Sequence, residues 1–142
     1  MVDDSLYREA IALGEAGEFG KAARLYKRLV AKSTDPRHLI GYGVCLQRLG
    51  HWEQSVVQLE RGVEVKPHYC EPDARLFLAE SYLRVKQKAR AIQQWRIVEG
   101  MPPEYPSYEA TAKEARTQLE LHAEKALRAT GALYLPSEPS ER

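Results

Sequence analysis

Four histidines and two cysteines are the residues of this chain best suited to hold a metal ion or to act as a nucleophile. The histidines are His38, His51, His68 and His122. No two of them have the HExxH spacing that places two imidazoles on one face of a helix. Cys45 and Cys70 do not form a metal-binding spacing, and His68 with Cys70 would be only half a site. We therefore predict surface histidines, free thiols and no metal.

Other catalytic signatures are missing from the sequence as well. There is no GxSxG motif around a nucleophilic serine. Each glycine stands at a predicted helix end or in a predicted helix stripe, rather than in a phosphate-binding loop. Trp52 and Trp95 fall on predicted core stripes, so we interpret both as packing residues. These observations predict a protein that is not an enzyme and has no cofactor.

The charge balance argues against further classes of partner. The 21 Lys and Arg residues nearly match the 20 Asp and Glu residues, for a net charge of +1. Such a balance provides no general field that would attract nucleic acid or anionic lipid. No apolar stretch approaches the roughly 18 residues that a membrane span needs, and the start of the chain lacks the features of a secretory signal. We expect a cytoplasmic protein that binds no nucleic acid and does not span a membrane.

The elements that would position a site follow from a pattern that occurs three times. The first copy has small residues at Ala10 and Gly17 and an aromatic residue at Tyr26. Gly43 and Ala79 take the place of Ala10 in the next copies, at successive offsets of 33 and 36 residues. A period near 34 residues with small residues at fixed places is typical of tetratricopeptide repeats. On these residues the chain resembles the tetratricopeptide repeat (TPR) family.

This resemblance implies an all-α fold, namely a right-handed α-solenoid of three TPR helix-turn-helix repeats plus a C-terminal capping helix. Such repeats stack because none of them can bury its apolar face alone. We expect a single TPR domain over residues 1–135. Its predicted parts are repeats at about 3–35, 36–69 and 72–103, a capping helix at about 107–130, and a disordered tail at 136–142.

Local signals agree with this division, with one departure. The second repeat opens with Asp35 and Pro36, which suit the cap and the first position of a helix. Gly43 costs a helix about 1 kcal/mol relative to alanine, and close approach of a neighbouring helix is a physical reason to accept that cost. In the third repeat, Lys86 and Lys88 replace the glycine and the aromatic residue that the family usually has at the turn.

The second repeat carries a further resemblance. Its motif is Asp35-x-Arg37-(x)3-Gly41-x-Gly43-x-Cys45-x-Gln47-(x)2-Gly50-x-Trp52, followed by Gly62. The motif resembles the middle repeat of the type III secretion chaperones that hold translocator proteins, which are small bacterial proteins with three repeats. This resemblance implies a chaperone that keeps an export substrate soluble.

The candidate binding site consists of residues that lie off the core stripe on the first helix of each repeat. They are Tyr7, Arg8, Ile11, Arg37, Ile40, Val44, Gln47, Arg48, Phe77, Glu80 and Arg84. The apolar members are not needed by a core, and an apolar strip rimmed by Arg and Gln suits an amphipathic helix or an extended peptide. The alternative is that the last helix, or the segment Leu133-Tyr134-Leu135, folds back and covers this strip.

Two functions are therefore open. The main prediction is a non-enzymatic adaptor or scaffold that binds a peptide or helix of a partner protein in the concave groove, with a homodimer also possible. The alternative is a bacterial secretion chaperone of the three-TPR type that holds an export substrate. An adaptor should be stable without its partner, whereas a chaperone should co-purify with an aggregation-prone protein.

Overall fold

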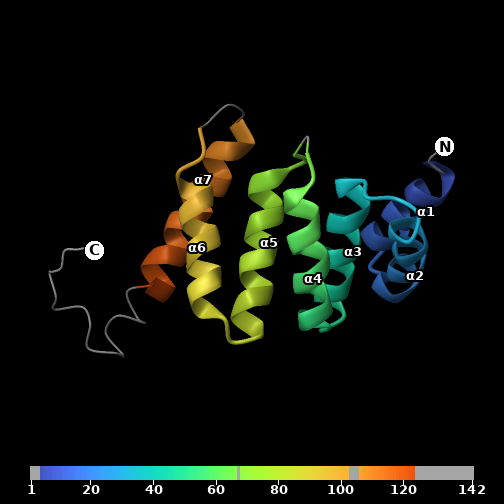
Figure 1. The fold of residues 1–142 in the computed structure, drawn as a ribbon, viewed down its shortest axis with the longest axis horizontal. Helices are drawn as coiled ribbons and strands as arrows, with labels where there is room; N and C mark the ends of the chain where they lie inside the picture. Colours follow the sequence, from blue (N-terminus) through green and yellow to red (C-terminus); the bar gives the residue numbers. More distant parts are fainter. Residues whose placement is uncertain (1–3, 67, 103–105, 124–142) are drawn as a thin grey trace, which may run out of the picture.

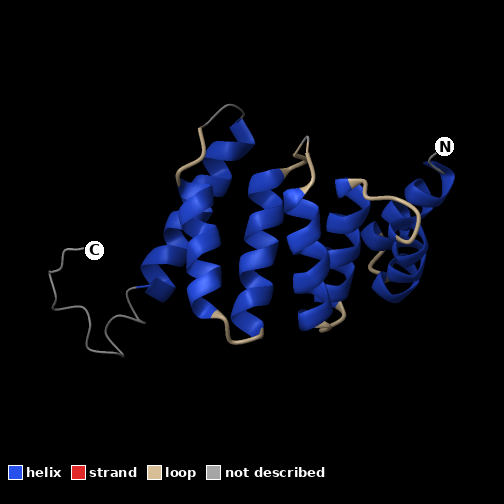
Figure 2. Ribbon diagram, viewed as in Figure 1, coloured by secondary structure: helices blue, strands red, loops and turns tan. Residues whose placement is uncertain are grey.

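The computed structural model describes residues 4–66, 68–102 and 106–123 of the 142-residue chain. Within these ranges every regular element is helical and no strand is present (Figure 2). The helices are α1 (Asp4–Glu15), α2 (Phe19–Val30), α3 (Pro36–Arg48), α4 (Trp52–Glu64), α5 (Glu71–Arg84), α6 (Lys88–Glu99) and α7 (Pro106–Gln118), and α7 continues as a π-helical segment, Leu119–Ala123. None of these helices is long and apolar enough to cross a membrane.

The helices form pairs that stand side by side in a row, with α7 following the third pair (Figure 1). In the described chain, α1 contacts α3, α3 contacts α5, and α5 contacts α7. The backbones of the second helices, α2, α4 and α6, do not approach one another over the same residues, and α4 and α6 are joined by an ion pair, with Arg90 at 3.9 Å from Glu60. The odd-numbered helices therefore lie on the inner side of the row. The prediction of an all-α solenoid of three helix pairs and a C-terminal helix is confirmed.

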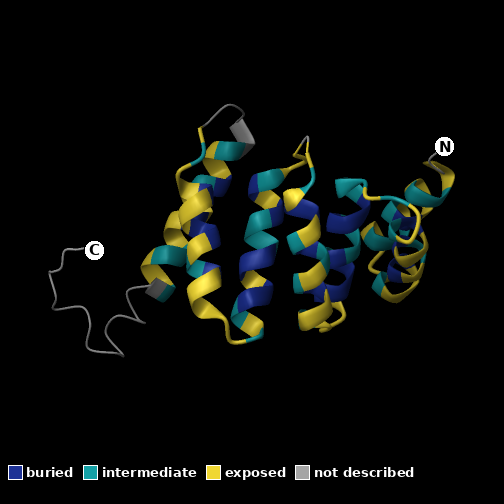
Figure 3. Cartoon of the chain, viewed as in Figure 1, coloured by how far each residue is buried: buried dark blue, intermediate teal, exposed yellow. Residues whose placement is uncertain are grey.

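Two apolar clusters form the core of the described residues (Figure 3). The N-terminal cluster joins the first helix pair to α3 and contains Ala10, Ala22, Ala23, Tyr26, Leu29 and Cys45. The C-terminal cluster contains Ile40, Leu59, Val63, Ala74, Leu78, Ala79, Tyr82, Ala91, Trp95, Val98 and Ala115. Burial raises the pKa of the Cys45 thiol to about 11, so this cysteine acts as a small apolar side chain at neutral pH.

Helices α3 and α4 approach closely at Gly43. A Cβ atom at this position would lie 2.6 Å from the Cγ atom of Leu59, whose side chain is fully buried. There is thus no room for any side chain larger than hydrogen. The prediction that close approach explains a glycine inside this helix is confirmed.

The three turns within the helix pairs share one backbone geometry. Gly17 and Gly50 adopt φ angles of 81° and 82°, and Lys86 adopts 65° at the equivalent place. In the third turn, the Lys86 amide donates to the Leu83 carbonyl at 3.1 Å and the Gln87 amide donates to the Tyr82 carbonyl at 2.8 Å. The first two turns have the same pair of hydrogen bonds. The third repeat therefore keeps the turn although a lysine has replaced the glycine.

A buried polar chain connects α3, α4 and α5. Ser55 donates to the Gly43 carbonyl at 2.8 Å, and its hydroxyl lies 2.9 Å from that of Ser81. The Gln47 amide donates to Ser81 Oγ at 2.7 Å and to the Phe77 carbonyl at 2.8 Å. Because the single proton of Ser55 is used on Gly43, Ser81 must donate to Ser55. These bonds fix the second repeat against the third.

Two predictions about single residues are corrected by the packing. His38 is not a surface residue, because its side chain is fully buried beneath the ring of Tyr7, at 5.0 Å between ring centroids. Trp52 is only half-buried, since it is the first residue of α4 and lies at the edge of the repeat. The Arg84 guanidinium covers its ring at 4.7 Å from the centroid.

The last helix also differs from the prediction. The α-helical hydrogen bonding of α7 ends at Gln118 and gives way to the π-helical segment Leu119–Ala123, whereas a continuous helix was expected over 107–130. Residues 124–130, Leu133-Tyr134-Leu135 and the expected tail at 136–142 lie outside the described residues.

Candidate functional site

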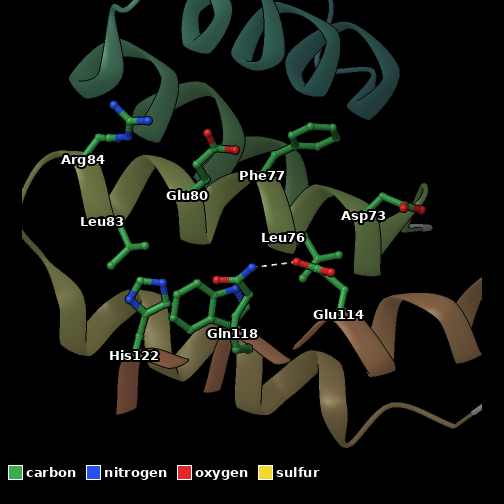
Figure 4. A pocket seen from close by; sticks show the side chains of 10 residues that line it. Asp73, Leu76, Phe77, Glu80, Leu83, Arg84, Glu114, Gln118 and His122 are labelled. Carbon is green, nitrogen blue, oxygen red and sulfur yellow. Dashed lines mark hydrogen bonds between the residues drawn. The ribbon is translucent and has the colours of Figure 1, made fainter. Parts of the chain in front are cut away.

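A groove of about 540 Å³ lies between α5 and α7 (Figure 4). Helix α5 supplies more than half of its lining, α6 supplies one tryptophan, and the α7 end of the chain supplies the opposite wall. The lining residues are Asp73, Leu76, Phe77, Glu80, Leu83, Arg84, Trp95, Glu114, Gln118 and His122. The volume falls in the range of about 300–1,000 Å³ that is usual for binding pockets.

Helical spacing explains why these side chains gather. The α5 residues lie three or four positions from others of the set, as Glu80 does from Leu76, Phe77, Leu83 and Arg84, which places them along one side of a helix. Glu114, Gln118 and His122 are four residues apart on the facing element. Figure 4 shows Leu76 and Leu83 pointing from α5 toward Gln118 and His122. The wall from α7 therefore faces the Leu76 and Leu83 side of α5, while Phe77, Glu80 and Arg84 point away from α7 at the other edge of the groove (Figure 4).

The floor of the groove is apolar and aromatic. Trp95 is buried, with 3% of its surface exposed, and its ring stacks on His122 at 5.3 Å between centroids. Leu76, Phe77 and Leu83 are half-buried and pack against the C-terminal core cluster. Large apolar side chains left partly open to water are what a bound apolar residue can cover. The geometry is suited to receiving a segment of another chain.

The rim of the groove is polar. Asp73, Glu80 and Glu114 supply carboxylates, and the Gln118 amide donates to Glu114 at 2.7 Å. No group of three or more His, Cys, Asp or Glu residues suited to a metal ion occurs in the described part of the chain. Arg84, at one end, is the guanidinium that also covers Trp52. These residues offer charge and hydrogen bonds to a ligand.

Three of the residues predicted for the binding site meet in this groove, namely Phe77, Glu80 and Arg84. Two others do not match the prediction of an open inner face. Ile40 is 8% exposed and belongs to the core, because it packs against α4 at Gly62. Gln47 is 3% exposed and its amide is used on α5.

The N-terminal part of the predicted strip is occupied by contacts within the chain. The Arg37 guanidinium lies 2.7 Å from the Asp35 carboxylate and 5.0 Å from the centroid of the Tyr7 ring. The hydrogen bond from Arg37 holds the pKa of Asp35 below its usual value, and burial raises the pKa of Tyr7. Tyr7 also packs against Tyr26 and His38. This end of the inner face is filled by its own side chains.

The remaining predicted site residues lie apart from the groove. Val44 is half-buried and packs against the C-terminal core cluster. Ile11 is half-buried on α1, while Arg8 and Arg48 are exposed. Their part in binding stays a prediction.

Sequence reasoning missed most of the groove. The missed residues are Asp73, Leu76, Leu83, Trp95, Glu114, Gln118 and His122. The four-residue spacing of Glu114, Gln118 and His122 is present in the sequence, but the prediction of a capping helix gives these residues no part in binding. The structure instead shows that α7 forms a wall of the groove.

Comparison with known proteins identifies the fold. A scan of protein-family models finds no match, and a search of curated proteins finds no relative. Among solved structures, PcrH in complex with the chaperone binding region of PopD has a TM-score of 0.79 and 24% identity, over 87% of this chain and 92% of PcrH. PcrH from Pseudomonas aeruginosa has a TM-score of 0.75 and 25% identity, over 84% and 90% of the two chains. The Yersinia enterocolitica type III secretion chaperone SycD, in complex with a peptide of the translocator YopD, has a TM-score of 0.77 and 21% identity, over 87% and 93%. The chain thus has the TPR-like fold of these chaperones.

Proposed function

We propose that this protein is a chaperone of the type III secretion translocator class, which binds a segment of an export substrate in the groove between α5 and α7. The observation that carries the proposal is an apolar groove on a fold shared with PcrH and SycD over more than four fifths of both chains. PcrH is described in complex with the chaperone binding region of PopD, and SycD in complex with a peptide of the translocator YopD. The motif in the second repeat points to the same class.

This proposal is narrower than a general adaptor. The adaptor prediction and the chaperone prediction share a groove that binds a peptide of a partner protein, and the solved structures favour the chaperone. The proposal includes three further expectations. The chain is a member of the TPR family with one domain over 1–135, it has a non-catalytic role in the cytoplasm, and it can form a homodimer.

The test is capture of partners from the host under conditions that induce secretion. Wild type, Phe77→Glu and Lys27→Glu would be compared as bait. Phe77 lines the groove, whereas Lys27 is exposed on α2 and is not part of it. We expect wild type and Lys27→Glu to retain one export substrate that is soluble only when co-expressed with the bait, and Phe77→Glu to lose it.

Two outcomes would contradict the proposal. Equal capture by Phe77→Glu, with a melting temperature close to that of wild type, would exclude this groove as the site. A captured partner that is folded and soluble alone would favour the adaptor. Because Phe77 and Leu83 both pack partly against the core, Glu80→Trp, which places a bulky side chain at an exposed position of the lining, provides a second groove variant.

A further inference from the structure

The groove is lined by more carboxylates than cations. Asp73, Glu80 and Glu114 are exposed and line it, while Arg84 is the only Lys or Arg among the lining residues. Leaving His122 aside, the lining has two more negative than positive charges, although the whole chain has a net charge of +1. A cleft with charge of one sign over an apolar floor concentrates its field toward the opening.

Among the residues that the structure describes, no Lys, Arg or His forms an ion pair with these carboxylates. The partner of Glu114 is the neutral amide of Gln118. Elsewhere the chain does pair its acids, as Arg75 lies 2.8 Å from Glu71 on the same helix α5. The acidic groups of the groove are thus available to an external cation.

The helix dipole does not explain two of these three residues. Asp73 lies in the first turn of α5, where a carboxylate interacts favourably with the helix dipole. Glu80 and Glu114 lie outside the first turns of α5 and α7, so the helix dipole does not favour either carboxylate. Because Glu80 and Glu114 lie on the two sides of the apolar floor, a ligand with an apolar side chain on the floor could place a cationic group next to either carboxylate.

Resting on the function proposed above, we infer that the groove selects a cationic amphipathic segment: a bulky apolar side chain on the Leu83 and Trp95 floor, flanked by Lys or Arg next to Glu80 and Glu114. The apolar anchor contributes most of the affinity, as anchors in desolvated pockets generally do. The carboxylates determine which apolar anchors bind, by favouring those with Lys or Arg beside them. Complementary charge acts mainly on specificity and on the rate of association.

The experiment is selection from a random 12-residue peptide library on immobilised wild type, with Phe77→Glu protein used for counter-selection. We expect the retained peptides to be enriched in Lys and Arg within a few positions of an apolar residue. Glu80→Lys should weaken binding of these peptides by about fivefold, as expected for one solvent-exposed charge contact and its reversal. Glu9→Lys, an exposed acid on α1 outside the groove, should leave their affinity unchanged.

Salt dependence gives a second measurement. The preference for basic over neutral peptides should shrink between about 0.05 M and 0.5 M NaCl, because exposed charges are screened. Peptides that are retained without enrichment of Lys or Arg, or that bind Glu80→Lys equally well, would overturn the inference while leaving the proposed function standing. If wild type and Phe77→Glu retain the same peptides, both fail. Self-association that Phe77→Glu abolishes would instead assign the groove to a second copy of this chain.

Discussion

Lys86 occupies a backbone conformation that suits glycine, and replacing it should stabilise the protein. Its φ of 65° lies in the left-handed region, as do the φ angles of 81° and 82° at Gly17 and Gly50. The hydrogen bonds of its turn are the same as those of the glycine turns. Lys86 is exposed, so a change to glycine removes little packing and acts mainly through the backbone.

The expected magnitude is a difference of two opposing effects. A side chain in the left-handed region costs roughly 1–2 kcal/mol, and Lys86→Gly removes that cost. Glycine also gives the unfolded chain more conformations, which destabilises by about 0.4–1 kcal/mol. The net expectation is that Lys86→Gly raises the free energy of unfolding by about 0.5–1 kcal/mol, or the melting temperature by about 2–4 °C for a chain of this size.

Urea unfolding followed by far-ultraviolet circular dichroism measures this effect, with an unchanged m-value as the check that the transition is the same. Lys86→Ala keeps the backbone cost and should remain within about 0.5 kcal/mol of wild type. Lys88→Gly, two positions later at the start of α6, should destabilise by up to about 1 kcal/mol. A Lys86→Gly protein less stable than wild type would refute the reasoning, because the lysine would then have to stabilise the turn through its side chain.

Two further predictions concern the core. Gly43→Ala should destabilise by about 1–3 kcal/mol in the same urea assay, because its methyl group would meet Leu59; a smaller loss would mean that α3 and α4 can separate. The pKa of His38 is lowered by burial, against the opposing effect of Asp35 at 3.9 Å. Below about pH 6.5 the unfolded state therefore binds more protons than the folded state. The free energy of unfolding should decrease as the pH is lowered, by up to about 1.4 kcal/mol per pH unit. His38→Leu should show a smaller fall between pH 7.5 and 5.5 in urea titrations, and identical profiles for the two proteins would contradict the burial of this histidine.

Local sequence was sufficient for the helices and their order. The start of α3 at Pro36, the turn at Gly50 and the small residues at Ala10, Gly43 and Ala79 agree with the structure. Each of these features depends on neighbours within one or two helical turns, or on a period that the chain repeats. The same reasoning failed at the end of α7, where the sequence contains no local signal for the change to π-helical bonding at Leu119.

Contacts between helices far apart in the chain were decided only by the tertiary structure. Nothing in the local pattern separates Ile40 or Gln47 from Phe77, yet the first two are buried by α4 and α5 while Phe77 stays partly open. The burial of His38 depends on Tyr7, from another repeat. The groove joins α5 to α7 across more than 30 residues of sequence. Helical periodicity determines which side chains share a face of one helix, but the angle and distance at which two helices pack determine which of those faces closes and which remains a groove.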